Sequence, residues 1–293
     1  MTDVSLPADP AVGGGHRKSA LQQVLSQPSA VIGGSIVIFF VLVAIFATLL
    51  SPYDPNASDW LAIRQAPSAA HWFGTDDLGR DILSRILVGA RASLLAGVIA
   101  VAIAIAIGVP LGLIAGYFGG LLDAVISRCT DALLAVPFLV LAIALAAFLG
   151  ASLQNAMIAI GVSAVPIFIR LTRGQVLVVK GEDYITAARA VGVRDRNIIV
   201  SHVFPNVLAP VVVQGTITMA VAILAEASLA FLGLGQRPPA PSWGSMLDVA
   251  RQFLIEAPWM AVWPGLAIVA IVLGFNLLGD GLNDALNPHR DTD

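Results

Sequence analysis

The stretch Ser93–Ala115, with the sequence SLLAGVIAVAIAIAIGVPLGLIA, decides the fold class of this chain. It carries no charged side chain, and its one polar side chain is the serine at its start. A helix needs about 20 apolar residues to cross the hydrocarbon core of a bilayer. The stretch therefore predicts a membrane-spanning helix.

Five further stretches are also apolar and long enough, or nearly so, to span a bilayer. The sequence therefore predicts an all-α polytopic membrane protein with six transmembrane helices. The third and fourth spans are short and are separated by little more than Gly150–Ser152, which predicts a tight helical hairpin. In chain order the five further spans are Ser29–Leu50, Leu133–Leu149, Asn155–Leu171, Ala209–Leu232 and Pro258–Leu278.

The composition supports this class, because 57% of the 293 residues are hydrophobic and 12% are charged. Soluble domains carry about 25% charged residues, so lipid is the expected solvent for much of this surface. A net charge of −3 argues against a nucleic-acid partner, which would require a strongly basic face. The single cysteine, Cys129, excludes an internal disulfide framework and a cysteine-rich metal site.

Residues 1–28 are rich in glycine and proline and are predicted to form a flexible cytoplasmic tail. Arg17 and Lys18 precede the first span, and several arginines lie between the fourth and fifth spans, as is typical of cytoplasmic segments. Six spans would place both termini on that side. The opposite side also carries arginines, so the predicted orientation rests in part on the family resemblance described below.

Two segments on the other side have patterns of their own. Apolar residues recur at helical spacing in Asp77–Arg91, which predicts an amphipathic helix at the membrane interface leading into the second span. The segment Gly233–Ala257 begins with a run of prolines and predicts an ordered turn region. Trp243, Trp259 and Trp263 are predicted to anchor this boundary of the membrane.

The segment Glu182–Asn206, EDYITAARAVGVRDRNIIVSHVFPN, is long and polar for a connection between spans. Asp183 is a predicted N-cap, and Gly192 stands where a helix C-cap needs a positive φ. A second short helix is predicted to follow and to stop at Pro205, with Ile198, Ile199 and Val203 turned inward. The plainer alternative is an ordinary connecting loop, but a loop of this length with its own structure usually has a function.

The paired alanines Ala187 and Ala188, followed by Gly192 and then Pro205, resemble the EAA loop of ABC-importer permeases. The resemblance implies the type I ABC-importer permease fold for residues 29–293 and a coupling role for the loop at 182–206. The chain departs from the EAA pattern at Thr186, where the family has glutamate, which removes one carboxylate from any contact with the ATPase. The residues to which the resemblance assigns contact with an ATPase are Tyr184, Thr186, Ala187, Ala188, Gly192 and Pro205.

Three more segments resemble signatures of the dipeptide, oligopeptide and nickel subgroup of these permeases: His71–Arg85, Ala225–Gly244 and Phe275–Pro288. Within the subgroup the chain is similar to the C-type subunit of the heterodimeric peptide permease. The resemblance implies half of a translocation pathway for peptides in the plasma membrane of a prokaryote. The implied partners are a homologous second permease, two ABC ATPase subunits or one fused ATPase chain, and an extracytoplasmic substrate-binding protein.

The chain shows no pattern typical of catalysis or of metal binding. No G-x-x-x-x-G-K-[ST], H-E-x-x-H or G-x-S-x-G sequence is present. We therefore expect no catalytic, cofactor or metal site in this chain, with ATP and Mg on the partner ATPase subunits.

Polar side chains within the predicted spans are candidates for function, because they are unfavourable in hydrocarbon. Gln214, Thr218 and Glu226 lie within a sector of roughly 120° of a helix, and Asn276 is the comparable residue of the last span. They are predicted to line the pathway or to contact the partner subunit. Two alternatives stay open: Glu226 bonds a neighbouring helix, or it serves an ion-coupled secondary transporter or channel that acts alone.

Overall fold

The computed structural model describes residues 20–286, which form a bundle of α-helices. Within this range the β-structure is limited to one isolated bridge between Thr75 and Asp81, so the predicted all-α class is confirmed. The predicted tail lies outside the described residues up to position 19, and its remainder includes a short helix. The helices are α1 (Ala20–Leu25), α2 (Pro28–Leu50), α3 (Ile82–Phe118), α4 (Gly120–Leu134), α5 (Phe138–Leu149), α6 (Leu153–Lys180), α7 (Asp183–Ala190), α8 (Asp195–Ile198), α9 (Phe204–Phe231), α10 (Trp243–Ala250) and α11 (Trp259–Leu286), with a π-helical turn η1 (Ile199–Val203) and a 3₁₀ turn η2 (Arg251–Phe253).

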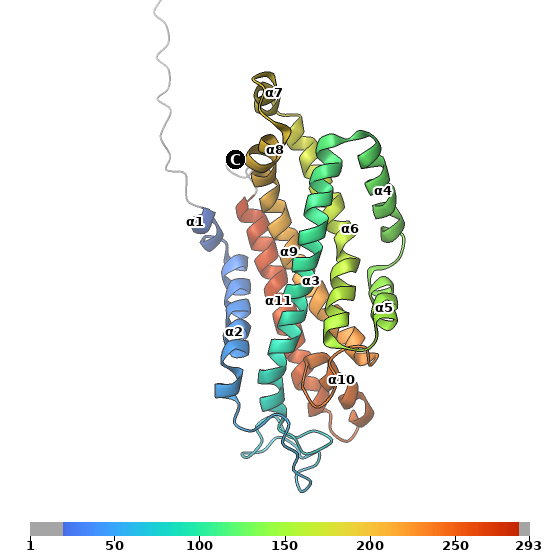
Figure 1. The fold of residues 1–293 in the computed structure, drawn as a ribbon. Helices are drawn as coiled ribbons and strands as arrows, with labels where there is room; N and C mark the ends of the chain where they lie inside the picture. The colour runs from blue at the N-terminus through green and yellow to red at the C-terminus, as the bar shows by residue number, and fades with distance from the viewer. Residues whose placement is uncertain (1–19, 287–293) are drawn as a thin grey trace, which may run out of the picture.

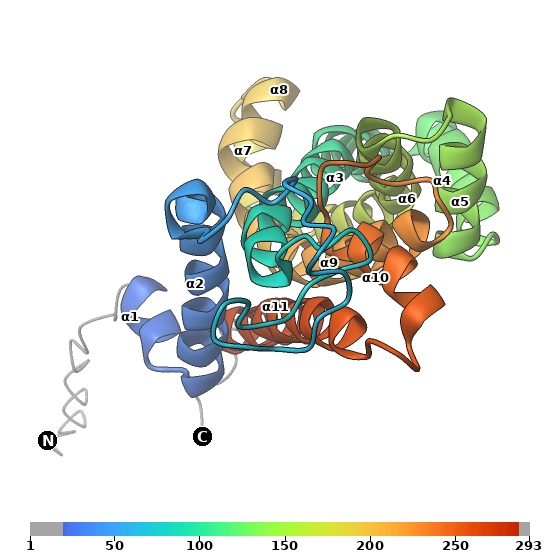
Figure 2. The same cartoon turned by 90° about the horizontal axis from the view of Figure 1, so that it is seen from below.

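The bundle has two ends that differ in structure (Figure 1). At the end drawn at the top, which we call the hairpin end, α7 extends beyond the long helices and α8 lies below it, where it leads into α9. At the loop end, drawn at the bottom, residues 51–81 and α10 cover the long helices, and Figure 2 looks onto this end.

Five of the described helical segments are long and apolar enough to cross a membrane. A sixth span exists if α4 and α5, which are bent by 90° at their junction, count as one. The predicted span Leu133–Leu149 is therefore wrong in its start, because Leu133 belongs to α4 and α5 begins at Phe138. Pro137 lies at the break, and the ring of a proline disfavours the helical conformation of the residue before it. The predicted hairpin between α5 and α6 is confirmed, since the two helices pack against each other.

The helix α3 contains the whole stretch that decided the fold class, and it is longer than that stretch. Its 37 residues correspond to about 55 Å at 1.5 Å per residue. It begins at Ile82, where the Asp81 carboxylate accepts a hydrogen bond from the Ser84 N–H. The predicted interfacial helix over Asp77–Arg91 is therefore wrong in its start. It is also wrong in its environment, because Ser84 and Arg85 are buried inside the protein.

The most extensive helix contact joins α3 to α6 along a row of glycines. Gly108, Gly112 and Gly116 recur every fourth residue and therefore lie on one face of α3. Small residues at this spacing let two helix backbones approach closely in a membrane. A Cβ added to each glycine would lie 2.6–2.7 Å from the Cβ atom of one α6 residue: Phe168 for Gly108, Thr172 for Gly112 and Val176 for Gly116.

The connection between α9 and α11 is more regular than predicted, because it contains the helix α10. Ser242 caps this helix in a capping box with Ser245. Trp243 is fully buried and donates its indole N–H to the Ile86 carbonyl (3.1 Å), so its predicted place as an interfacial anchor is wrong. The ring of Trp243, the first residue of α10, packs against α3 and α2, where it meets the Phe40 ring edge-on.

Candidate functional site

The segment Glu182–Asn206 is a helical hairpin at the end of the bundle, and we call it the hairpin segment. Its two arms, α7 and α8, are joined by a turn in which Gly192 has φ of +80°. The Gly192 N–H donates to the Arg189 carbonyl (2.9 Å), and the Val193 N–H donates to the Ala188 carbonyl (3.1 Å). The predicted C-cap is therefore confirmed.

Two details of the predicted hairpin are wrong. Asp183 is the first residue of α7 rather than its cap, and the flanking Glu182 makes no side-chain cap hydrogen bond. Pro205 does not end the second helix but occupies the first turn of α9. The π-helical turn η1 joins α8 to α9 without a break. The second arm of the hairpin segment is thus a direct extension of a membrane-spanning helix.

One face of the hairpin segment is buried and the other is exposed. Ile185, Ile198 and Val203 are fully buried, in a cluster with apolar residues from the neighbouring ends of α3 and α6. The opposite face carries the residues predicted to contact an ATPase. Of these, Ala188 is half-buried and the others are exposed: Tyr184, Thr186, Ala187, Gly192 and Pro205.

The exposed face is held in shape by contacts of α7 with η1 and with the start of α9. The Asn206 side-chain amide donates to the Tyr184 hydroxyl (3.3 Å) and to the His202 carbonyl (2.6 Å). The Tyr184 and His202 rings meet edge-on with centroids 6.4 Å apart. The hairpin segment therefore presents a formed surface rather than a loose loop.

Glu226, the predicted polar residue of α9, lies in the interior of this chain. Its side chain is fully buried, and its Oε2 accepts a hydrogen bond from the Ser93 hydroxyl at 3.3 Å. The same Ser93 oxygen accepts a hydrogen bond from the backbone N–H of Trp243 at 3.2 Å. Glu226 Oε1 has no hydrogen-bond partner. The carboxyl group thus joins α9 to α3 and, through Ser93, to the start of α10.

Glu226 and Thr218, which are predicted to line a pathway or contact a partner, are buried in this conformation, and that role stays a prediction. Both side chains are covered by neighbouring elements of the same chain, which a helical wheel of α9 alone does not reveal. Thr218 donates its hydroxyl to the Gln214 carbonyl at 2.7 Å. Gln214 is half-buried and Asn276 is exposed on α11, so their roles stay predictions.

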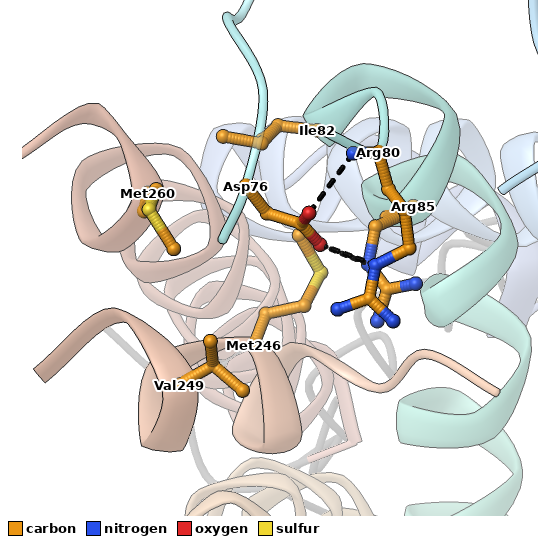
Figure 3. A pocket seen from close by; sticks show the side chains of 7 residues that line it. All are labelled: Asp76, Arg80, Ile82, Arg85, Met246, Val249 and Met260. Carbon is orange, nitrogen blue, oxygen red and sulfur yellow. Dashed lines mark hydrogen bonds and ion pairs between the residues drawn. The ribbon is translucent and has the colours of Figure 1, made fainter. Parts of the chain in front are cut away.

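At the loop end a buried ion-pair network explains much of the polar sequence before α3. The Asp76 carboxylate forms ion pairs with the Arg80 Nε at 2.7 Å and with the Arg85 Nε at 3.3 Å. It also accepts the backbone N–H groups of Leu78 (3.0 Å) and Arg80 (2.9 Å). Figure 3 shows Asp76 directed toward the two arginines, with Met246 and Val249 of α10 beside them.

A second carboxylate, Asp81, is equally engaged. Its Oδ1 lies 3.0 Å from the His71 Nδ1. Its Oδ2 accepts both the N–H (2.8 Å) and the hydroxyl (2.7 Å) of Ser84. The polar residues that the sequence placed on a surface helix therefore bond one another and fix the loop end onto α3.

The bundle and its hairpin segment define a polytopic helical membrane protein, and comparisons with known proteins identify its family. Residues 108–292 match the binding-protein-dependent transport system inner membrane component family, and the chain belongs to it. Residues 17–67 match the N-terminal TM domain of oligopeptide transport permease C. The chain is thus a multi-pass permease subunit of an ABC importer, and its family implies a partner permease and ATPase subunits.

Two curated relatives illustrate the likeness. The chain is 50% identical over 274 residues to the dipeptide transport system permease protein DppC of Alkalihalophilus pseudofirmus, covering 92% of this chain and 89% of the relative. It is 49% identical over 263 residues to the glutathione transport system permease protein GsiD of Salmonella typhimurium. This match covers 89% of this chain and 87% of the relative.

The fold has a match among solved structures. An inward-facing structure of the MetNI methionine ABC transporter superposes with a TM-score of 0.57 at 20% sequence identity. The match covers 69% of this chain and 96% of that chain. The type I ABC-importer permease fold, which the sequence resemblance implied, is confirmed.

Proposed function

We propose that this chain forms half of the translocation pathway of a peptide importer and that the hairpin segment docks on an ATPase. In this proposal the hairpin end and both termini face the cytoplasm, and a substrate-binding protein meets the loop end. A second, homologous permease completes the pathway. ATP is bound and hydrolysed on partner chains.

The observation that carries the docking assignment is the two-faced hairpin segment. Its apolar side chains, such as Ile185 and Ile198, are buried against the bundle, so the segment is rigidly attached. Its other face is exposed, and it includes α7, which extends beyond the ends of the long helices, where another protein can reach it (Figure 1). Small side chains such as Ala187 on that face permit close approach of a second surface.

Short peptides are the substrate class that the relatives support. The two relatives described above are named for dipeptides and for glutathione, itself a small peptide. The spans of this chain offer few charged groups to recognise side chains, so we infer that the substrate is handled by its shape and backbone. Selection among peptides then falls to the binding protein.

Replacing Gly192 with valine is expected to weaken docking of the ATPase. A β-branched residue at φ +80° is strained by about 1–2 kcal/mol, which corresponds to roughly a 5- to 30-fold change in the population of the docking conformation. No heavy atom lies within 4 Å of the added Cβ, so the effect comes from the backbone and not from a clash. Co-purification of the ATPase and ATP-dependent dipeptide uptake in proteoliposomes measure the effect.

The matched control is Gly192→Asn, because asparagine adopts the left-handed conformation more readily. It is expected to retain most of the docking and uptake. Wild-type docking by the valine variant would contradict the assignment of the hairpin segment.

Replacing Glu226 with glutamine tests the rival function, an ion-coupled carrier or channel acting alone. An ATP-driven importer is expected to keep its uptake, because glutamine has nearly the same volume and can still accept the Ser93 hydroxyl. A carrier that uses the carboxylate as its proton or cation site would lose transport. Uptake by the complete importer with and without ATP, and by this chain alone, is the measurement. Uptake by the chain alone that the glutamine variant abolishes would favour the rival.

A further inference from the structure

We infer that Tyr117 is the positioning residue that transmits movement of the hairpin segment to the membrane-spanning helix α3. The inference rests on the proposed docking of an ATPase on the hairpin segment. Tyr117 is the penultimate residue of α3 and is 3% exposed. Tyr117 contacts three elements at the hairpin end: α6, α7 and α8.

The first contact is a hydrogen bond across the hairpin end. The Tyr117 hydroxyl donates to the Asp195 Oδ1 at 2.6 Å. Asp195 is the first residue of α8, the arm that continues through η1 into α9. Hydrogen bonds to carboxylates are shorter and stronger than neutral ones. This bond therefore ties α3 to the base of the second arm.

The remaining contacts involve the ring and the backbone of Tyr117. The Arg189 guanidinium of α7 lies 5.0 Å from the ring centroid, and the Lys180 ammonium at the end of α6 lies 5.7 Å from it. Both distances are typical of cation–π interactions. Lys180 also donates to the Tyr117 carbonyl oxygen at 2.5 Å. Tyr117 thus contacts the end of α6 and both arms of the hairpin segment.

This arrangement gives the hairpin segment two kinds of attachment to the membrane helices. By chain connection it is attached to α6 and α9, whereas it reaches α3 by side-chain contacts alone. The apolar packing of Ile185 and Ile198 keeps the segment on the bundle, but an apolar contact has no fixed direction. The Tyr117–Asp195 bond is directional, so it fixes the position of the second arm relative to α3.

A displacement of the hairpin segment by an ATPase would therefore reach α3 most directly through this bond. Because α3 packs closely on α6 through its glycines, part of the displacement also reaches α3 through α6, so loss of the bond is expected to reduce the transfer and not to abolish it. Without the bond the hairpin segment still docks, but its displacement is less completely transferred. The expected consequence is ATP hydrolysis with less transport.

The test uses Tyr117→Phe in the complete importer with its binding protein, reconstituted in proteoliposomes. This change removes the hydroxyl and keeps the ring that faces Arg189 and Lys180. We expect normal co-purification of the ATPase and near-normal ATP hydrolysis. We expect the amount of radiolabelled dipeptide taken up per ATP to fall severalfold.

Variants at Asp195 separate a positioning role from a structural one. Asp195→Ala is expected to lower the ratio of uptake to ATP hydrolysis as Tyr117→Phe does, and the double variant to lower it no further. Asp195→Asn keeps an oxygen that can accept the Tyr117 hydroxyl and is expected to restore much of the ratio. Tyr53→Phe removes a hydroxyl that donates to the Ala70 carbonyl at the loop end (2.8 Å) and serves as the control.

Three results would overturn the inference. One is an unchanged uptake-to-ATP ratio in Tyr117→Phe, and another is additive losses in the double variant. The third is loss of the ATPase from the Tyr117→Phe complex, because this would make the residue structural. A wild-type complex that binds no ATPase would instead overturn the proposed function itself.

Discussion

Asp76→Ala is expected to destabilise the loop end by about 3–5 kcal/mol, since it leaves two buried arginines without their shared carboxylate. Arg80 and Arg85 are 6% and 5% exposed, so water cannot replace the lost partner. The backbone N–H groups of Leu78 and Arg80 also lose their acceptor. Equilibrium unfolding of the purified complex in mixed detergent micelles measures the change in the free energy of unfolding.

An exposed ion pair at the same end provides the control for Asp76→Ala. Arg64 and Glu256 lie 2.8 Å apart with side chains 36% and 66% exposed. Glu256→Ala is therefore expected to change the free energy of unfolding by less than about 1 kcal/mol. If the two variants lose equal stability, the loop end does not depend on the buried network.

Gly112→Leu is expected to prevent α3 from packing on α6. The added Cβ would lie 2.6 Å from the Thr172 Cβ and 2.8 Å from the Ile169 carbonyl oxygen, and the backbone cannot move away without separating the helices. Overpacking of a buried site costs typically about 1–3 kcal/mol and occasionally more, and here the whole helix pair is affected. The measurement is the yield of monodisperse permease after extraction from membranes, which is expected to fall severely.

Gly174→Leu places the same side chain on a helical glycine that has open space. No heavy atom lies within 4 Å of the Cβ that the substitution adds to Gly174 of α6. Its yield is expected to stay close to that of the wild type, because leucine is also the better helix former. Equal yields from the Gly112 and Gly174 variants would refute the close α3–α6 contact.

The sequence predicts most spans correctly because a bilayer imposes a length and a composition on each of them. Ser93–Ala115 lies wholly inside α3, and Ser29–Leu50 differs from α2 by one residue at its start. Gly192 was also predictable, since a glycine after a short helix meets a backbone requirement that few residues satisfy. These features depend on local rules, and local rules can be read from the chain.

The errors arise where a residue's surroundings depend on distant parts of the chain. A helical wheel of α9 does not predict that Glu226 is buried, because the residues that cover it, Ser93 of α3 and the start of α10, lie far away in the sequence. Arg85 fits the polar face of an amphipathic pattern, yet its side chain is buried in an ion pair with the Asp76 carboxylate. Tyr117 gave no motif at all. Its one sequence signal is a tyrosine hydroxyl just beyond the end of the apolar stretch Ser93–Ala115.

The glycine row of α3 has a consequence for the synthesis of the protein. The chain is made from its N-terminus, so α3 enters the bilayer before its partner α6 exists. During the several seconds in which α4, α5 and α6 are translated, the face of α3 formed by Gly108, Gly112 and Gly116 is not yet packed against α6. A ribosomal pause that falls after α3 has entered the bilayer and before α6 has emerged would prolong this interval and expose the young chain to mispairing. A pause after α6 has packed on α3 would be harmless to this contact.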